Sequence, residues 1–132
     1  MTDFVDFATL ERPPKPNTYL LAPKGLCQAA KPDANSPVFE EAPAELFSKV
    51  QTLVGDTPRW GKVRSDEAGL KLAFVASTAL LRFKDDIDIQ VLPGDDGSGA
   101  RIAIYSRSRI GHSDLGANRK RVAKFIHELT SN

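Results

Sequence analysis

Two segments of this chain alternate between apolar and polar residues, and a loop rich in glycine and aspartate joins them. Residues 86–91 alternate strictly, residues 93–99 form the loop, and residues 101–108 return with the same period. A period of two predicts β-strands whose apolar side chains share one face. An antiparallel register with Ile89 opposite Ile104 buries the apolar side chains of both strands, and a slip of one residue would turn them outward. This hairpin therefore constrains how the rest of the chain can pack.

The same register assigns partners to the polar residues of the hairpin. Its pairs are Ile87 with Ser106 and Asp85 with Ser108 on the apolar face, and Asp86 with Arg107 and Asp88 with Tyr105 on the other face. The two serines thus occupy core positions, and because buried hydroxyls need partners, we expect Asp85 to bind them. We also expect Asp86 and Arg107 to form a cross-strand ion pair worth about 0.2–1 kcal/mol.

The remaining periodicities predict two helices and two further strands. We expect a helix over 42–54, strands over 60–65 and 70–74, and a final helix over 115–129 with Ser113 or Asp114 as its N-cap. Residues 78–83 either extend the second strand or begin the third. The order α-β-β-β-β-α, with contiguous strands, predicts an α+β fold in which two helices cover a four-stranded antiparallel meander.

The N-terminal residues 1–37 contain six of the nine prolines. Proline lacks an amide hydrogen and fixes φ, so this part is not expected to form a regular helix or an interior strand. We expect an extended arm with a few apolar anchors such as Phe7 and Leu20, which is either disordered or lies across the folded body. A single α+β domain over residues 38–132 is expected to follow it, with enough chain to bury a hydrophobic core.

Several absences from the sequence point to a soluble cytoplasmic protein. No apolar run is long enough for a membrane span, and the acidic N-terminus does not have the pattern of a signal peptide. One cysteine, Cys27, excludes an intramolecular disulfide framework and fits a reducing compartment.

Charge is distributed unevenly along the chain. Residues 1–100 hold 11 Lys/Arg and 15 Asp/Glu, whereas residues 101–132 hold seven Lys/Arg and two Asp/Glu. A basic C-terminal segment can attract nucleic acid, anionic lipid or phosphate. The sequence favours internal pairing as the main use of this charge. The expected partners are the acidic residues Asp85, Asp86, Asp88, Asp95 and Asp96.

The run from Tyr105 to Arg121 joins the last strand to the last helix and is the main candidate for a functional site. It holds four arginines, one lysine, three serines and two glycines. Arginines, glycines and the free amides of a helix N-terminus can together hold an anion. The residues expected to bind such a ligand are Arg107, Arg109, His112, Ser113, Asn118 and Arg119. Those expected to form a structural polar network are Asp85, Asp86, Ser106, Ser108 and Asp114. The alternative is a polar lock that pins strand to helix.

Asn118 falls inside the apolar stripe expected for the last helix, which is formed by Leu115, Val122, Ile126 and Leu129. A buried asparagine must be hydrogen-bonded. We expect its partners to be backbone groups of residues 110–114.

The sequence favours a non-enzymatic module that binds a small anionic or amphipathic ligand, or a partner, near this junction. Two alternatives stay open. One is a small hydrolase that uses Asp85 or Asp86 with His112, and the other is a protein-interaction domain that uses the basic C-terminal helix. His112, Ser113 and Asp114 are adjacent in sequence and lack a nucleophile-elbow pattern, which disfavours a catalytic triad.

Cofactor and nucleic-acid motifs are missing from the sequence. There is no phosphate-binding loop, dinucleotide fingerprint or metal-ligand spacing, so neither a cofactor nor a metal is expected. Aromatic residues are not interleaved with the basic ones, so nucleic-acid binding is not expected. Trp60 and Phe83 are expected to be core or pocket-wall residues.

Two of these segments resemble a family signature. The segment Lys-Asp-Asp-Ile-Asp-Ile after Phe83, and the run from Tyr105 to Arg121, resemble the bacterial and plastid family catalogued as domain of unknown function 1499. The resemblance covers residues 27–129, and Gly25-Leu-Cys27-Gln stands where members have an asparagine-cysteine motif. It implies no established activity. It groups, as one constellation, Asp85, Asp86, Arg107, Arg109, Asp114, Asn118 and Arg119.

Overall fold

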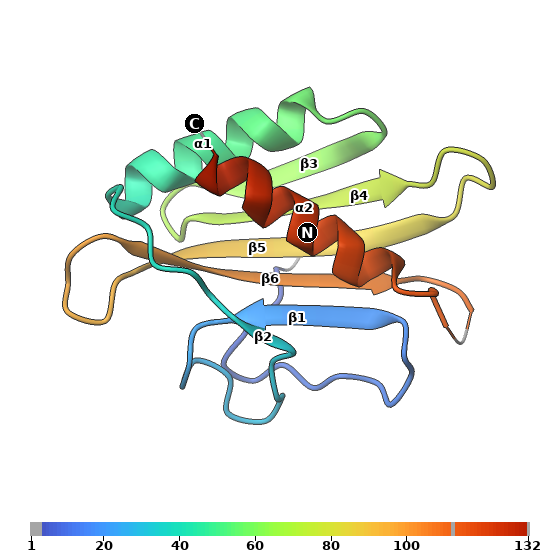
Figure 1. Ribbon diagram of the computed structural model, residues 1–132, viewed down its shortest axis with the longest axis horizontal. Coiled ribbons are helices and arrows are strands. Elements are labelled where there is room, and N and C mark those ends of the chain that lie inside the picture. Colours follow the sequence, from blue (N-terminus) through green and yellow to red (C-terminus); the bar gives the residue numbers. More distant parts are fainter. Residues whose placement is uncertain (1–3, 112, 132) are drawn as a thin grey trace.

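The computed structural model describes residues 4–111 and 113–131 and has an α+β fold. One mixed sheet of six strands has the order β2-β1-β6-β5-β4-β3, and two helices lie across the same face of it (Figure 1). The elements are β1 Thr18–Ala22, β2 Ala34–Asn35, α1 Pro43–Asp56, β3 Trp60–Asp66, β4 Lys71–Ser77, β5 Lys84–Pro93, β6 Ala100–Ser108 and α2 Ala117–Thr130.

The register predicted for the β5–β6 hairpin is confirmed. Ile89 lies opposite Ile104, and the pairing continues without a shift from Asp85 opposite Ser108 to Pro93 opposite Ala100. The isoleucines of the apolar face are at most 2% exposed. Period-two alternation favours this pairing because a slip of one residue would expose them.

The predicted four-stranded meander is wrong as a description of the whole sheet. The strands β3 to β6 pair antiparallel in chain order, but the proline-rich N-terminal residues add two more strands. Strand β1 pairs antiparallel with β6 and lies inside the sheet, and β2 pairs parallel with β1. Pro16 and Pro23 flank β1 without interrupting it, so all five residues of the strand keep the amide hydrogens that sheet pairing uses.

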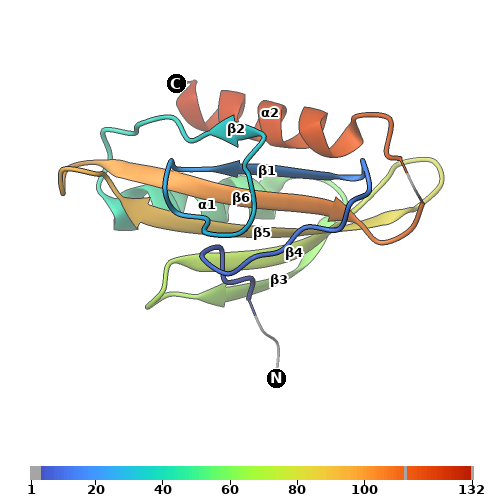
Figure 2. The same cartoon turned by 90° about the horizontal axis from the view of Figure 1, so that it is seen from below.

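Each face of the sheet has its own hydrophobic cluster. On one face, Leu46 and Val50 of α1 and Val122 and Phe125 of α2 pack against the isoleucines of β5 and β6. On the opposite face, which we call the outer face, Phe7 packs with alternate residues of the neighbouring strands, namely Leu20, Ala22, Ala103 and Tyr105. Figure 2 shows this N-terminal segment on the side of the sheet away from α2. The arm therefore completes a second layer.

Helix α2 begins two residues later than predicted. Leu115 and Gly116 have φ values of 55° and 84°, so they form a left-handed turn ahead of the helix. Leu115 is 88% exposed, and its assignment to the buried stripe is wrong. Val122, Phe125 and Leu129 form that stripe. The N-cap is Gly116, so the prediction of Ser113 or Asp114 as the N-cap is wrong. Asp114 lies two residues earlier, and its carboxylate accepts hydrogen bonds from the amides of Gly116 and Asn118, which stabilise the turn ahead of the helix.

The segment 78–83 belongs to neither adjacent strand. It is a loop closed by two hydrogen bonds, from the Thr78 amide to the Phe83 carbonyl and from the Phe83 amide to the Thr78 hydroxyl, both 2.9 Å. No helix in the described part of the chain is long and apolar enough to cross a membrane.

Candidate functional site

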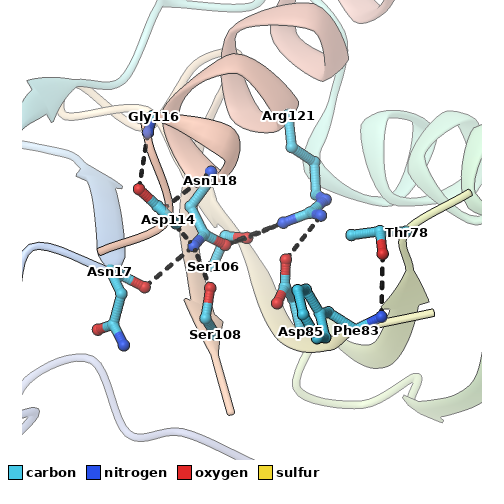
Figure 3. Close-up of polar contacts among 10 residues, drawn as sticks. All are labelled: Asn17, Thr78, Phe83, Asp85, Ser106, Ser108, Asp114, Gly116, Asn118 and Arg121. Atoms are coloured by element: carbon cyan, nitrogen blue, oxygen red, sulfur yellow. Dashed lines mark hydrogen bonds and ion pairs between the residues drawn. The ribbon is translucent and has the colours of Figure 1, made fainter. Parts of the chain in front are cut away.

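Asn118 is the centre of a buried polar network between β6 and α2 (Figure 3). Its side chain is fully buried. Its Oδ1 accepts hydrogen bonds from the Ser106 hydroxyl at 2.6 Å and from Arg121 Nη1 at 2.9 Å. Its Nδ2 lies 2.6–3.0 Å from three oxygens, which are the Asn17 carbonyl, the Ser108 hydroxyl and Asp114 Oδ2. Every polar atom of this side chain is therefore satisfied within the protein.

The prediction for Asn118 named a correct segment for one partner but the wrong type of group. Asp114 lies in the expected segment 110–114, yet it binds Asn118 through its side chain and not through its backbone. The main-chain partner is the carbonyl of Asn17, which precedes β1. No local sequence pattern indicates this contact, because the two residues are 101 positions apart.

Asp85 forms an ion pair with Arg121 and does not bind the two serines. The distance from Arg121 Nη2 to Asp85 Oδ2 is 2.7 Å, and the two side chains are 14% and 4% exposed. Arg121 Nη1 also donates to the Ser106 hydroxyl at 3.1 Å. The expectation of Asp85–serine bonds is wrong because Arg121 lies between them and takes the carboxylate as a charged partner.

On the outer face, Arg107 of β6 and Arg109, which follows β6, each pair with an aspartate of β5 on a diagonal. Asp86 lies opposite Arg107 in register, as predicted, but its carboxylate receives two hydrogen bonds of 2.9 Å from Arg109. Arg107 donates to Asp88 at 2.8 Å and lies over the Tyr105 ring. The expected Asp86–Arg107 ion pair is therefore wrong. Diagonal neighbours on one face of a sheet are within reach of a side chain as long as arginine.

These contacts confirm that internal pairing takes up much of the basic charge. Arg101, Arg107, Arg109 and Arg121 each pair with an aspartate of the acidic cluster, which are respectively Asp95, Asp88, Asp86 and Asp85. The hydrogen bonds from Arg109 lower the pKa of Asp86, although its partial burial opposes the shift.

The start of α2 is occupied by the protein's own carboxylate. Asp114 accepts hydrogen bonds from the Gly116 amide at 2.8 Å and the Asn118 amide at 3.1 Å. Burial of Asp114 disfavours its charge, but the hydrogen bonds from the Asn118 side chain and from these amides outweigh burial and lower its pKa. These amides are therefore not free to bind an external anion at this helix terminus.

The residues predicted to bind a ligand do not surround one cavity. Arg107 and Arg109 lie on the outer face, and Asn118 is buried in the network on the helix side. Ser113 and Arg119 line a cleft of about 630 Å³ beside the arm, together with Arg12 and Lys15. His112 lies outside the described residues. For the hydrolase alternative, Asp85 and Asp86 are successive strand residues, so their side chains point to opposite faces of the sheet.

A different cleft brings cations and an aromatic side chain together. It has a volume of about 340 Å³ and lies where α2 meets the ends of α1 and β4 and the start of β3. The residues that line it are Thr57, Pro58, Arg59, Trp60, Ser77, Thr78, Ala79, Arg121, Lys124, Phe125 and Glu128. We call it the Trp60 cleft. Trp60 was predicted to be a core or pocket-wall residue, and it both packs against the helix-side core and lines this cleft. Arg59, Arg121 and Lys124 were not predicted to belong to a ligand site. The one sequence signal for two of them was helical spacing, which places Arg121 and Lys124, three residues apart, on the same side of α2.

Other candidate chemistry is sparse. Among residues 4–111 and 113–131, no three histidine, cysteine, aspartate or glutamate side chains cluster as metal ligands do. Burial raises the pKa of the Cys27 thiol, which keeps it protonated and less nucleophilic.

Comparison with known proteins agrees with the family resemblance. The family model described as "Protein of unknown function (DUF1499)" matches residues 10–129. The match begins before Cys27, so it includes the proline-rich residues that supply β1 and β2. No curated protein matches the chain.

Proposed function

We propose that this chain, which belongs to the DUF1499 family, is a non-enzymatic module that binds a small anionic ligand with an aromatic or apolar part. The site is the Trp60 cleft, at the end of the run from Tyr105 to Arg121. The observation that carries the proposal is the convergence of Arg59, Arg121 and Lys124 with Trp60 around one cavity. A cavity with a few convergent polar groups and apolar walls is typical of a small-molecule site.

The walls of the cleft are held in place without a ligand. The Trp60 ring stacks on Phe74 at 4.7 Å between centroids and lies 5.8 Å from the Phe125 ring. Arg59 has a φ of 65°, and its carbonyl accepts a hydrogen bond from the Ser77 amide. A non-glycine residue persists in this left-handed conformation only where its surroundings fix it. Such preorganisation lowers the entropic cost of binding.

The charges in the cleft suit a small anion. The cleft is lined by three cations, which are Arg59, Arg121 and Lys124, and by one carboxylate, which is Glu128. Asp85 forms an ion pair with Arg121 outside the cleft, so the net charge of these five groups is +1. Arg59 and Lys124 are exposed, and the described residues form no ion pair with either. The volume of about 340 Å³ lies at the lower end of the range for ligand pockets, which favours a metabolite over a polymer.

A binding role fits the cleft better than catalysis. The described residues that line it include hydroxyl groups but no histidine or cysteine, and their one carboxylate, Glu128, is exposed to solvent. Hydroxyl nucleophiles need an adjacent base to activate them. The ion pair of Asp85 with Arg121 turns the nearest buried carboxylate into a structural partner of the network.

The fluorescence of Trp60 tests the proposal directly, because Trp60 is the only tryptophan of the chain. Titration with phenyl phosphate is expected to change this fluorescence saturably, whereas phenol is expected to have little effect. Arg59→Gln and Lys124→Gln should each weaken binding about tenfold, since each removes a charged hydrogen-bond donor. Lys120→Gln, on the same helix but outside the cleft, is the matched control. Absence of a saturable change, or binding of phenyl phosphate by both cleft variants as tightly as by the wild-type chain, would contradict the proposal.

A further inference from the structure

Exposed apolar side chains gather at one end of the sheet. Among the residues that the structure describes, seven large hydrophobic side chains are exposed, and five of them lie on two loops: Leu80, Leu81, Phe83, Ile110 and Leu115. The β4–β5 loop carries the first three, and the β6–α2 connection carries the other two. Figures 1 and 2 both show the two loops at the same end of the molecule. We call these five residues the apolar tip.

The two loops lie against each other and keep the apolar tip together. The Arg109 amide donates to the Lys84 carbonyl at 3.2 Å, which continues the β5–β6 ladder into the loops. Phe83, Ile110 and Leu115 line a shared cleft of about 250 Å³. Leu80 and Leu81 project beyond it from a loop that is closed by hydrogen bonds at its base, and they are 88% and 65% exposed. Exposed apolar groups in such a cluster mark an interaction surface.

Basic residues accompany the apolar tip. The segments 78–86 and 109–121 hold six lysines and arginines against three aspartates, a net charge of +3. Two of these aspartates pair with Arg109 and Arg121, and the third caps α2. Arg82 and Lys84 flank Phe83 and are exposed, with no ion pair to either within the described residues. The surface thus combines protruding apolar groups with a positive field.

We infer that the apolar tip docks on an anionic lipid bilayer. Apolar side chains on two projecting loops can enter the interface between headgroups and acyl chains, while flanking cations are attracted to anionic headgroups. The charge complementarity selects an anionic surface as the occupant. The inference goes beyond the proposed function, since Leu80 and Leu81 lie outside the Trp60 cleft.

Flotation of the full chain with vesicles tests this inference. The chain is expected to float with phosphatidylcholine vesicles that contain phosphatidylserine, and to stay unbound with phosphatidylcholine alone. The double variant Leu80→Ser with Leu81→Ser should reduce partitioning at least about tenfold, because withdrawing one leucine side chain from water contributes about that factor. Arg82→Gln and Lys84→Gln should each reduce it about fivefold.

Matched controls lie elsewhere on the surface. Val38 and Val63 are exposed apolar residues outside the apolar tip, and Lys24 is an exposed cation of the arm. Val38→Ser with Val63→Ser, and Lys24→Gln, are expected to leave flotation unchanged. Binding of phenyl phosphate at Trp60 should survive in the Leu80/Leu81 variant, so failure of the bilayer inference and failure of the proposed function give different results.

Three outcomes would overturn the inference. The first is absence of flotation with vesicles that contain phosphatidylserine. The second is equal flotation of the wild-type chain and the Leu80/Leu81 variant. The third is sedimentation of the wild-type chain as a dimer and of the Leu80/Leu81 variant as a monomer. The apolar tip would then be an interface between two copies of the chain.

Discussion

The buried network around Asn118 and the Trp60 cleft share one residue, Arg121, and differ in how their polar groups are satisfied. In the network, Asn118, Ser106 and Asp85 are buried and all have partners inside the protein. In the cleft, Arg59 and Lys124 are exposed and make no ion pair with another described residue. The densest polar segment of the sequence therefore serves mainly the structure. Groups available to a ligand lie on the other side of Arg121.

Removing Asp85 should cause the largest loss of stability in the buried network. Asp85→Ala leaves the charge of Arg121 buried without its partner, so we expect the free energy of unfolding to fall by about 3–5 kcal/mol. Urea denaturation followed by far-ultraviolet circular dichroism measures this loss. Replacing both partners, as Asp85→Leu with Arg121→Leu, should cost less than Asp85→Ala alone, and the opposite order would contradict the structural role of the pair.

Truncation of Asn118 should have the next largest effect. Asn118→Ala removes a common partner of Ser106, Ser108 and Arg121 and is expected to lower the free energy of unfolding by about 2–3 kcal/mol, because buried groups lose their hydrogen bonds. Lys120→Ala, two positions away and exposed, should change it by less than about 0.5 kcal/mol. Equal stability of the two variants in urea would show that the network does not lock β6 to α2.

Asp114 should give a smaller, pH-dependent effect. Asp114→Ala is expected to cost about 1 kcal/mol at neutral pH, the usual contribution of a helix-capping side chain. The pKa of Asp114 is lowered in the folded protein, so its contribution is present above the pKa of the unfolded chain, about 3.9. It is lost as the pH falls through the folded pKa. Stability measured between neutral and acidic pH should therefore fall less steeply in the variant, and parallel curves would contradict this sign.

The Asp86–Arg109 pair should give the smallest effect. Its side chains are 33% and 46% exposed, so solvent screens the pair, and Asp86→Asn should cost under about 1 kcal/mol. Added salt should reduce this cost further. If Asp86→Asn lowered the free energy of unfolding in urea as much as Asp85→Ala, the ion pairs of the outer face would be as important for stability as the buried network, contrary to this expectation.

The sequence predicted the parts of the fold that local periodicity controls. The β5–β6 register followed from the alternation around Ile89 and Ile104, since a slip of one residue would turn the apolar side chains of both strands outward. Strand β1 was missed because Pro16 and Pro23 surround a five-residue segment that contains no proline itself. The start of α2 was misplaced because the Asp114 cap imposes a left-handed turn that the apolar spacing of Leu115 conceals.

The candidate site was harder to predict, because its residues are distant in sequence. The Asn17–Asn118 bond and the meeting of Arg59 with Lys124 each join segments that share no local pattern. The diagonal pairs of Arg107 and Arg109 depend on side-chain reach, which the register alone does not specify. Internal pairing of the basic residues was predictable, since an acidic cluster lies on the neighbouring strand and loop.

We propose that a ligand binds in the Trp60 cleft while the Asn118 network stays closed. Amide chemical shifts in a ¹H–¹⁵N NMR titration with phenyl phosphate distinguish the two sites. We expect saturable shifts at the Trp60 indole N–H and at the amides of Ser77 and Lys124, with the Asn118 side-chain amide nearly unchanged. Shifts centred on Asn118, Ser113 and Asp114, or no saturable shift at Trp60, would contradict it.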